Sequence, residues 1–161
     1  MSALSGGQLS DMVKKITSVN KFYRGITTRD LKLRPPSLVK NTPQIYIQNT
    51  GYLARGIHWV LIIYKGSDVI FFDSFGRNPK DLHLEASAAQ PYKTITYNPF
   101  QLQNNNSEVC GHYIIFVLYF LSQKKTLYQI NKLFTADTHK NDKLVLNFVS
   151  KLAKKWRVEI T

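Results

Sequence analysis

Apolar residues gather in short runs along the chain, separated by polar segments that contain glycine, proline and asparagine. The segment 58–64 is almost wholly apolar after its histidine, which is typical of a strand that is covered on both faces. A short loop, 65–68, leads into a second apolar segment, 69–73, so the pair predicts an antiparallel hairpin. Two further short strands are predicted at 44–48 and 94–97.

Helical spacing appears near both ends of the chain. Ser10 and Asp11 can cap a short helix over 11–19. The segment 143–155 alternates lysines with apolar residues at helical spacing, which predicts an amphipathic helix. Its predicted inward-facing residues are Leu144, Val145, Phe148, Val149 and Leu152. Two interruptions are also predicted, a proline-containing break at 34–37 and a turn at 49–51.

The longest apolar run, 113–121, cannot be assigned by periodicity alone, but its extension to Gln123 is long for a strand. We therefore predict a buried helix that begins close to Cys110, with Ser107 as its N-cap. The segment 101–108 before it is polar and rich in asparagine, so it is expected to be a surface loop.

Length and composition favour a single globular domain. The chain has 161 residues, of which 43% are hydrophobic and 20% charged. Its one cysteine excludes an internal disulfide and fits a reducing compartment. No signal-peptide pattern is visible, and no apolar run is long enough to span a bilayer.

The net charge of +12 is large for this length and unevenly distributed. Eight basic residues fall within 1–40 and nine within 124–157, whereas the middle of the chain is nearly balanced. Solvated helix faces would explain a modest excess. An excess of this size favours a polyanionic partner, most simply DNA, which would be bound through its phosphates without sequence preference.

The cysteine lies where the helix prediction places an N-terminus. Oriented N–H groups at such a terminus lower the pKa of a thiol and can donate to a developing oxyanion. Gly111 beside Cys110 would let a substrate backbone approach without a side chain in the way. The alternative is that Cys110 is a small buried hydrophobic residue, as lone cysteines more often are.

A catalytic cysteine needs a base, and the chain has four histidines. His58 begins a predicted buried strand and is the best candidate. His83 and His139 lie in polar loops, and His112 would point to a different face of the helix from Cys110. A histidine at a strand end can also be an ordinary, partly exposed polar residue.

Two further residues complete a candidate site. The predicted hairpin is antiparallel, so it brings Asp73 to the same end as His58, where a carboxylate would orient the imidazole. An ordinary Asx turn is the alternative for Asp73. Gln103 could supply a side-chain amide to an oxyanion hole, although a glutamine in an asparagine-rich loop is weak evidence by itself.

Four segments together resemble the adenovirus maturation protease family (adenain), which also occurs in virophages and Polinton-type elements. Ubiquitin-like-protein proteases are a more distant resemblance. In this sequence Asp73 lies 15 residues after His58, and Cys110 lies seven after Gln103. The matching segments, which span about a third of the chain, are Gly56-Ile57-His58-Trp59-Val60, Phe72-Asp73-Ser74-Phe75-Gly76, Leu102-Gln103 and Ser107-Glu108-Val109-Cys110-Gly111-His112-Tyr113.

The resemblance implies an α+β fold, with a mixed central β-sheet flanked by helices and the nucleophile at the N-terminus of a buried central helix. It implies that Cys110 is the nucleophile, His58 the general base, Asp73 its partner and Gln103 the oxyanion donor. Trp59 would pack beside the histidine or line the substrate site. The implied activity is cleavage of viral capsid and core precursor proteins after glycine, in the virion, the host nucleus or a cytoplasmic virus factory.

One departure concerns activation. The adenovirus enzyme is activated by DNA and by a peptide attached through a second cysteine, which this chain lacks. A disulfide-tethered activator is therefore excluded, whereas DNA, a noncovalent peptide or no activator remain open; no metal or other cofactor is expected. Two alternatives also remain: a protease of ubiquitin-like modifiers, and a non-catalytic, basic DNA-binding packaging protein in which Cys110 is merely buried.

Overall fold

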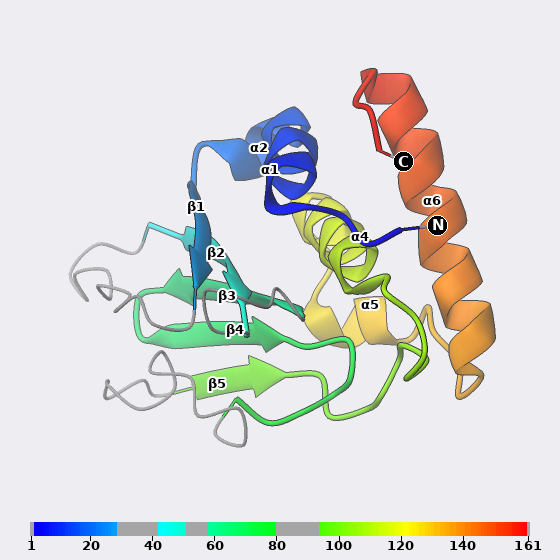
Figure 1. Ribbon diagram of the computed structural model, residues 1–161. Coiled ribbons are helices and arrows are strands. Elements are labelled where there is room, and N and C mark those ends of the chain that lie inside the picture. Colours follow the sequence, from blue (N-terminus) through cyan, green and yellow to red (C-terminus); the bar gives the residue numbers. More distant parts are fainter. Residues whose placement is uncertain (1, 29–41, 51–57, 80–93, 161) are drawn as a thin grey trace.

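The computed structural model describes residues 2–28, 42–50, 58–79 and 94–160. Its centre is a mixed five-stranded sheet in the order β1-β2-β3-β4-β5 (Figure 1). The two outer pairings, β1 with β2 and β4 with β5, are parallel, and the two central pairings are antiparallel. The strands are β1 (Tyr23–Thr28), β2 (Gln44–Asn49), β3 (Trp59–Lys65), β4 (Asp68–Phe72) and β5 (Thr94–Tyr97).

The helices lie on one side of this sheet, with α4 between the sheet and α6 (Figure 1). This arrangement confirms the α+β fold with a mixed sheet and a buried central helix. The helices are α1 (Gly6–Lys15), α2 (Thr17–Asn20), α4 (Cys110–Ser122), α5 (Leu127–Asn131) and α6 (Thr138–Trp156). Among the described residues, no helix is both long and apolar enough to cross a membrane.

The hairpin of β3 and β4 is confirmed, with strand ends within one residue of the predicted ones. The strands β2 and β5 are also found where the alternation placed them. The strand β1 was not predicted because it lacks a continuous apolar run: Arg24 and Gly25 interrupt it, and it ends in two threonines. The predicted break at 34–37, Gly51 of the predicted turn and His83 lie outside the described residues.

Burial on both faces of β3 explains its almost wholly apolar sequence. Leu61 and Ile63 belong to the core beneath the helices, whereas Val60, Ile62 and Tyr64 join a second apolar cluster on the other face. A strand with one solvated face would show polar residues at alternate positions. The absence of that alternation in 59–64 is therefore explained by apolar packing on both faces of the strand.

The helix α4 begins at Cys110, as predicted, but its cap differs from the prediction. Val109 is the N-cap residue and makes no side-chain capping bond. The hydroxyl of Ser107 instead donates to the carbonyl of Asn104 at 3.1 Å, which closes a turn before the helix. Every residue from Cys110 to Leu118 is buried, so tertiary packing holds this helix without a capping side chain.

The terminal helices begin earlier than predicted because better caps lie upstream. Ser5 and Gln8 form a reciprocal capping box, so α1 starts at Gly6 instead of near Ser10. Asp137 caps α6, which starts five residues before the predicted 143. The short helix α5 was not predicted, although Thr126 and Gln129 form the same kind of capping box there.

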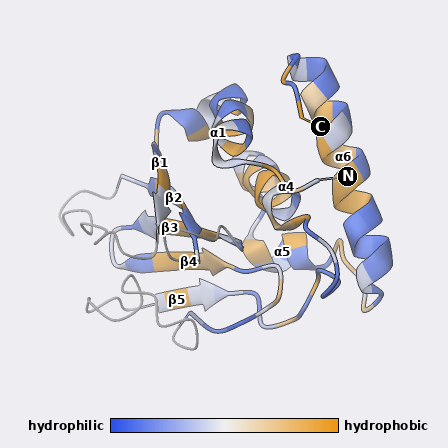
Figure 2. Ribbon diagram, in the orientation of Figure 1, coloured by the Kyte–Doolittle hydropathy of each residue, from blue (hydrophilic) through white to orange (hydrophobic). Residues whose placement is uncertain are grey.

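Figure 2 shows α4 as a mostly hydrophobic ribbon and α6 as an alternation of hydrophobic and hydrophilic residues. Val145, Val149 and Leu152 of α6 are buried as predicted. Leu144 is 40% exposed, so its predicted inward position is wrong. The apolar stripe of α6 meets α4 along a narrower face than the sequence alone indicated, and Phe148 lies at its margin, where it contacts Phe116 and Tyr119.

His112 is fully buried within α4, and neither of its ring nitrogens has a hydrogen-bond partner among the described residues. Burial penalises the charged imidazolium, which lowers the pKa of His112 from 6.5 to about 4. The unfolded chain therefore binds this proton at higher pH than the folded chain. Stability must fall as the pH decreases from about 7 through 4.

We expect the free energy of unfolding to lose about 2 kcal/mol through His112 between pH 7.5 and pH 5, given that pKa of about 4. His112→Leu should abolish this part of the acid sensitivity, as measured by urea unfolding at both pH values. The exposed His139→Leu is the matched control and should behave like the unmodified chain. An unchanged pH dependence in His112→Leu would contradict the assignment.

Candidate active site

The two central antiparallel strands bring His58 and Asp73 together. His58 immediately precedes β3 and Asp73 immediately follows β4, and the register pairs Leu61 with Phe72. The Nε2 atom of His58 lies 2.5 Å from Oδ1 of Asp73, and both side chains are buried. The proximity expected from the hairpin is therefore present.

The Asp73 carboxylate accepts from several donors. Its Oδ1 also accepts the N–H of Phe75 at 3.0 Å, and its Oδ2 accepts Nε–H of Arg77 at 2.7 Å. Burial raises the pKa of this carboxyl, but the interactions with His58, Arg77 and the Phe75 N–H lower it, leaving the pKa below its ordinary value. The Phe75 bond is an Asx turn, so the local turn and the contact with the imidazole coexist in one side chain.

The His58 ring is fixed on several sides. Because Nε2 faces Asp73, the nitrogen that remains for the Cys110 thiol is Nδ1. One face of the ring stacks on Phe75, with ring centroids 4.8 Å apart. Burial lowers the pKa of His58, but the hydrogen bonds and charges of Asp73 and Cys110 raise it, and the pKa lies above its ordinary value. The ring thus has the defined orientation that a base requires.

Cys110 is the first residue of α4 and is 5% exposed. Backbone N–H groups in the first turn of a helix have no intrahelical partner, so they are available to a ligand or a developing charge. Together with His58, Trp59 and Gln103, Cys110 lines a cavity of about 480 Å³. The cysteine is therefore at a surface that a substrate can reach, and is not enclosed in the main core.

The amide of Gln103 is buried and hydrogen-bonded at both ends. Its Nε2 donates to the carbonyl of Ser107 at 2.8 Å, and its Oε1 accepts the hydroxyl of Ser74 at 2.6 Å. An amide nitrogen carries two hydrogens, so one remains after the bond to Ser107. Since Gln103 lines the same cavity as Cys110, this arrangement can offer a donor to an oxygen bound there.

Hydrogen bonds from helices α4 and α6 hold the loop that carries Gln103. The carbonyl of Leu102 lies 2.9 Å from the Tyr113 hydroxyl and accepts Nδ2–H of Asn141 at 3.1 Å. The Tyr113 hydroxyl also donates to Asp142 at 2.8 Å. These buried bonds tie the loop to both α4 and α6, which the sequence did not indicate.

Trp59 and Gly111 differ in their position relative to the cavity. Trp59 lines the cavity, and its indole N–H donates to the carbonyl of Leu4 at 3.1 Å. A Cβ added to Gly111 would come within 3.1 Å of Leu4 and of Leu9. Gly111 is not among the residues that line the cavity, so its role in this structure is close packing against the N-terminal segment instead of direct access for substrate.

Two site residues escaped the sequence analysis. Arg77 reaches Asp73 from a loop four residues along, and Asn98 binds the Asp73 backbone on both sides, accepting from its N–H at 3.1 Å and donating to its carbonyl at 2.6 Å. A buried Asn98 directly after β5 was the available indication, because an asparagine at a strand end often bonds to backbone. The segment Ala3–Ser5, which also lines the cavity, gave no indication at all.

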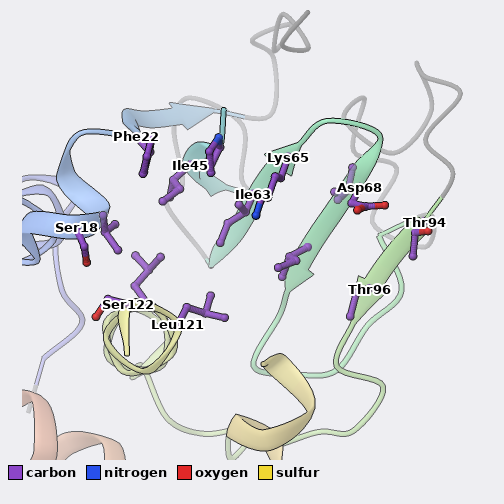
Figure 3. Close-up of a pocket in the computed structure, with 15 residues that line it drawn as sticks. Ser18, Phe22, Ile45, Ile63, Lys65, Asp68, Thr94, Thr96, Leu121 and Ser122 are labelled. Atoms are coloured by element: carbon purple, nitrogen blue, oxygen red, sulfur yellow. The ribbon is translucent and has the colours of Figure 1, made fainter. Parts of the chain in front are cut away.

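A second cavity, of about 520 Å³, lies at the other end of the sheet (Figure 3). Its lining is mainly apolar and includes Ile45, Ile63 and Leu121, with Lys65 and Asp68 at the rim beside the β3–β4 turn. None of the candidate catalytic residues borders this cavity. The chemistry expected from Cys110 therefore belongs to the cavity at the opposite strand ends.

Several solved structures share this fold. ChlaDub1 from Chlamydia trachomatis aligns at 11% identity with a TM-score of 0.61, covering 98% of this chain and 96% of that one. The Chlamydia trachomatis effector protein Cdu1, solved bound to ubiquitin, aligns at 10% identity with a TM-score of 0.63, covering 97% and 94%. The ASFV pS273R protease aligns at 11% identity with a TM-score of 0.55, covering 88% of this chain and 64% of that one.

No protein-family model and no curated protein sequence matches the chain. At identities this low, the structural likeness establishes a common fold, and a function has to be argued from the site. The shared fold agrees with the α+β fold that the resemblance implies and does not single out adenain.

Gly76 holds the turn after Asp73 against the loop before Gln103. Its φ is +69°, and a Cβ there would lie 2.4 Å from the carbonyl carbon of Phe100, which is backbone and cannot move aside easily. We expect Gly76→Ala to lower the free energy of unfolding by more than about 2 kcal/mol, from both the positive φ and the clash.

The matched control for this substitution is Gly25→Ala. Gly25 also has a positive φ, +111°, but no atom of the described residues lies within 4 Å of its added Cβ. The strain at its φ alone should cost about 1–3 kcal/mol in the same urea-unfolding measurement, and the clash adds to such strain only at Gly76. Equal losses for the two variants would show that the contact with Phe100 is unimportant.

Proposed function

We propose that this chain is a cysteine peptidase and that its substrates are proteins joined to ubiquitin or to a ubiquitin-like modifier. The observation that carries the peptidase proposal is that Cys110 and His58 line the same cavity at one end of the sheet, where Asp73 bonds to the His58 ring. The fold likeness to Cdu1, which was solved bound to ubiquitin, supports the substrate class.

The reaction is an acyl transfer. The thiolate of Cys110 attacks the scissile carbonyl carbon, and the resulting oxyanion accepts from the Cys110 N–H and the remaining Nε2–H of Gln103. Protonated His58 then gives its proton to the departing amine, which leaves a thioester on Cys110. His58 next takes a proton from water, which attacks the thioester and releases the carboxylic acid and the thiol.

The environment of His58 suits these proton transfers. The raised pKa of His58 keeps the imidazolium available as an acid, and the ionised Asp73 stabilises its positive charge from the Nε2 side. Arg77 binds Oδ2 of Asp73, and Oδ1 is the carboxylate oxygen that contacts the imidazole. No metal or other cofactor takes part in this proposal.

Small residues beside the scissile bond fit this proposal. The residues that line the cavity around Cys110 include Trp59, the segment Ala3–Ser5, Gln103, Ser107 and Glu108. Glycine next to the cleaved bond would enter a cavity lined in this way with the least steric contact. Glycine-containing cleavage sites are what the resemblance to ubiquitin-like-protein proteases and adenain implies.

Capsid and core precursor cleavage during virion maturation is the second candidate. The motif resemblance to adenain and the fold shared with the ASFV pS273R protease favour it. It requires only a short glycine-containing segment in the cleft, whereas a modifier protease also binds the folded body of the modifier.

The substrate class can be tested with a fluorogenic ubiquitin conjugate and a short glycine-ending peptide that carries the same dye. We expect kcat/KM to be at least about tenfold higher for the conjugate, because the folded modifier adds binding energy. Equal values, together with cleavage of viral precursor proteins, would favour maturation of virions instead. The conjugates of several ubiquitin-like modifiers should be compared in parallel.

Variants separate the peptidase proposal from the choice of substrate. Cys110→Ala should abolish turnover, and His58→Ala should lower it by more than about a hundredfold, while the exposed His139→Ala leaves it unchanged. Cleavage that survives in Cys110→Ala would refute the peptidase proposal for every substrate.

The positive charge of the chain supports a separate proposal, that it binds nucleic acid. Lys14 and Lys15 of α1 and Arg157 after α6 line one surface depression, so the two basic ends of the chain meet there, beside Asp11 and Glu159. Replacing both Lys14 and Lys15 with Gln should weaken binding to duplex DNA and reduce the slope of log K against log salt by about 2. Lys65→Gln, at the end of β3 and outside this depression, is the control. An unchanged slope in the double variant would show that this surface does not bind DNA.

A further inference from the structure

Ser74 connects the two halves of the candidate site. It follows Asp73 directly, and its hydroxyl donates to Oε1 of Gln103 at 2.6 Å. Both Ser74 and Gln103 are 1% exposed. A single turn after β4 therefore holds the carboxylate that orients His58 and the hydroxyl that binds the amide of Gln103.

The backbone of Ser74 reinforces this contact. Its carbonyl accepts the N–H of Leu102 at 2.9 Å and the N–H of Gln103 at 3.0 Å. The start of the Gln103 side chain and its far end are thus both fixed to the same residue. A glutamine fixed at both ends loses little rotational freedom on binding a substrate, which is the condition for a preorganised donor.

The Ser107 carbonyl can only accept, so it selects the amide orientation, and the Ser74 hydroxyl donates to the oxygen at the other end. The amide nitrogen faces the Ser107 carbonyl at 2.8 Å, and its oxygen faces the Ser74 hydroxyl. A flipped amide would set two carbonyl oxygens against each other at Ser107 and would turn Oε1 toward the cavity, where it would repel an oxyanion. The bond from Ser74 also polarises the amide, which strengthens its N–H groups as donors.

We propose that Ser74 is a positioning residue that fixes the Gln103 amide with a nitrogen toward the Cys110 cavity, and so sets the strength of the oxyanion hole. This inference rests on the peptidase proposal. Ser74 is not among the residues that line the cavity, so it acts through Gln103 and does not touch the substrate.

The test is the turnover of Ser74→Ala on the fluorogenic substrate that the enzyme cleaves best. We expect kcat to fall by about tenfold to a hundredfold, less than the loss from removing the oxyanion donor itself, with KM within about twofold. Ser10→Ala is the matched control: it also removes a hydroxyl hydrogen bond, to Tyr23 at 2.8 Å, and should leave kcat unchanged.

The double variant Ser74→Ala/Gln103→Ala decides whether Ser74 acts through the amide. If it does, the double variant should be no slower than Gln103→Ala alone. Losses that multiply would overturn the proposal and would show that Ser74 acts through another route, such as the position of Asp73. Ser74→Cys, which keeps the volume with a weaker donor, should also lower kcat and replaces Ser74→Ala if that variant does not fold.

Alkylation by iodoacetamide supplies a second readout that a general disturbance of the site would change. It consumes the Cys110 thiolate by displacement and forms no oxyanion. Ser74→Ala and Gln103→Ala should therefore keep the unmodified alkylation rate within about twofold, whereas Asp73→Asn, which disturbs His58, should slow it. Slow alkylation in Ser74→Ala would overturn the positioning role.

The outcomes distinguish this inference from the proposed function. Full turnover in Ser74→Ala, with none in Cys110→Ala, would support the peptidase proposal and refute the positioning role of Ser74. Turnover that persists in Cys110→Ala would instead refute the peptidase itself.

Discussion

The antiparallel pairing of β3 with β4 is the constraint on which the rest of the site depends. It fixes which residues stand at the same end of the two strands, and the register leaves His58 one residue before β3 and Asp73 one residue after β4. A slip of one residue would change every pair across the two strands and shift His58 along the sheet relative to Asp73. Packing on both faces of β3 holds the strand in the core, and the contact between the imidazole and the carboxylate depends on that position.

The helix α4 supplies the third element by packing against the same strand. It is buried along its first nine residues, Cys110 to Leu118, so its position is set by the core and not by a capping side chain. Core packing at this density leaves little freedom for a helix to shift. The cysteine is in this way delivered to the end of the sheet where the hairpin has placed the histidine.

Around these elements, buried polar residues that each bond to two groups fix neighbouring segments relative to one another. Asn98 binds both backbone groups of Asp73, and Ser74 binds both the backbone and the amide of Gln103. Buried polar groups must be paired, so such residues specify one arrangement of loops that apolar contacts alone would leave loose. The cleft is consequently rigid on the side that faces the proposed oxyanion.

The sequence alone determined the elements whose causes are local or nearly so. The uninterrupted apolar run after His58, the hairpin to Asp73 and the helix at Cys110 could all be predicted, because the length of each apolar run and the short loop between the two strands indicate them. The strand β1, the caps at Ser5 and Asp137, and the partners of Gln103 could not. Only the tertiary structure decided that Arg77 and Asn98 bind Asp73 and that Leu4 lies over Gly111. Asn98 and Leu4 are distant in the chain from their partners, so those contacts depend on how the core packs; Arg77 is only four residues from Asp73, but no sequence pattern indicated that its side chain turns toward the carboxylate.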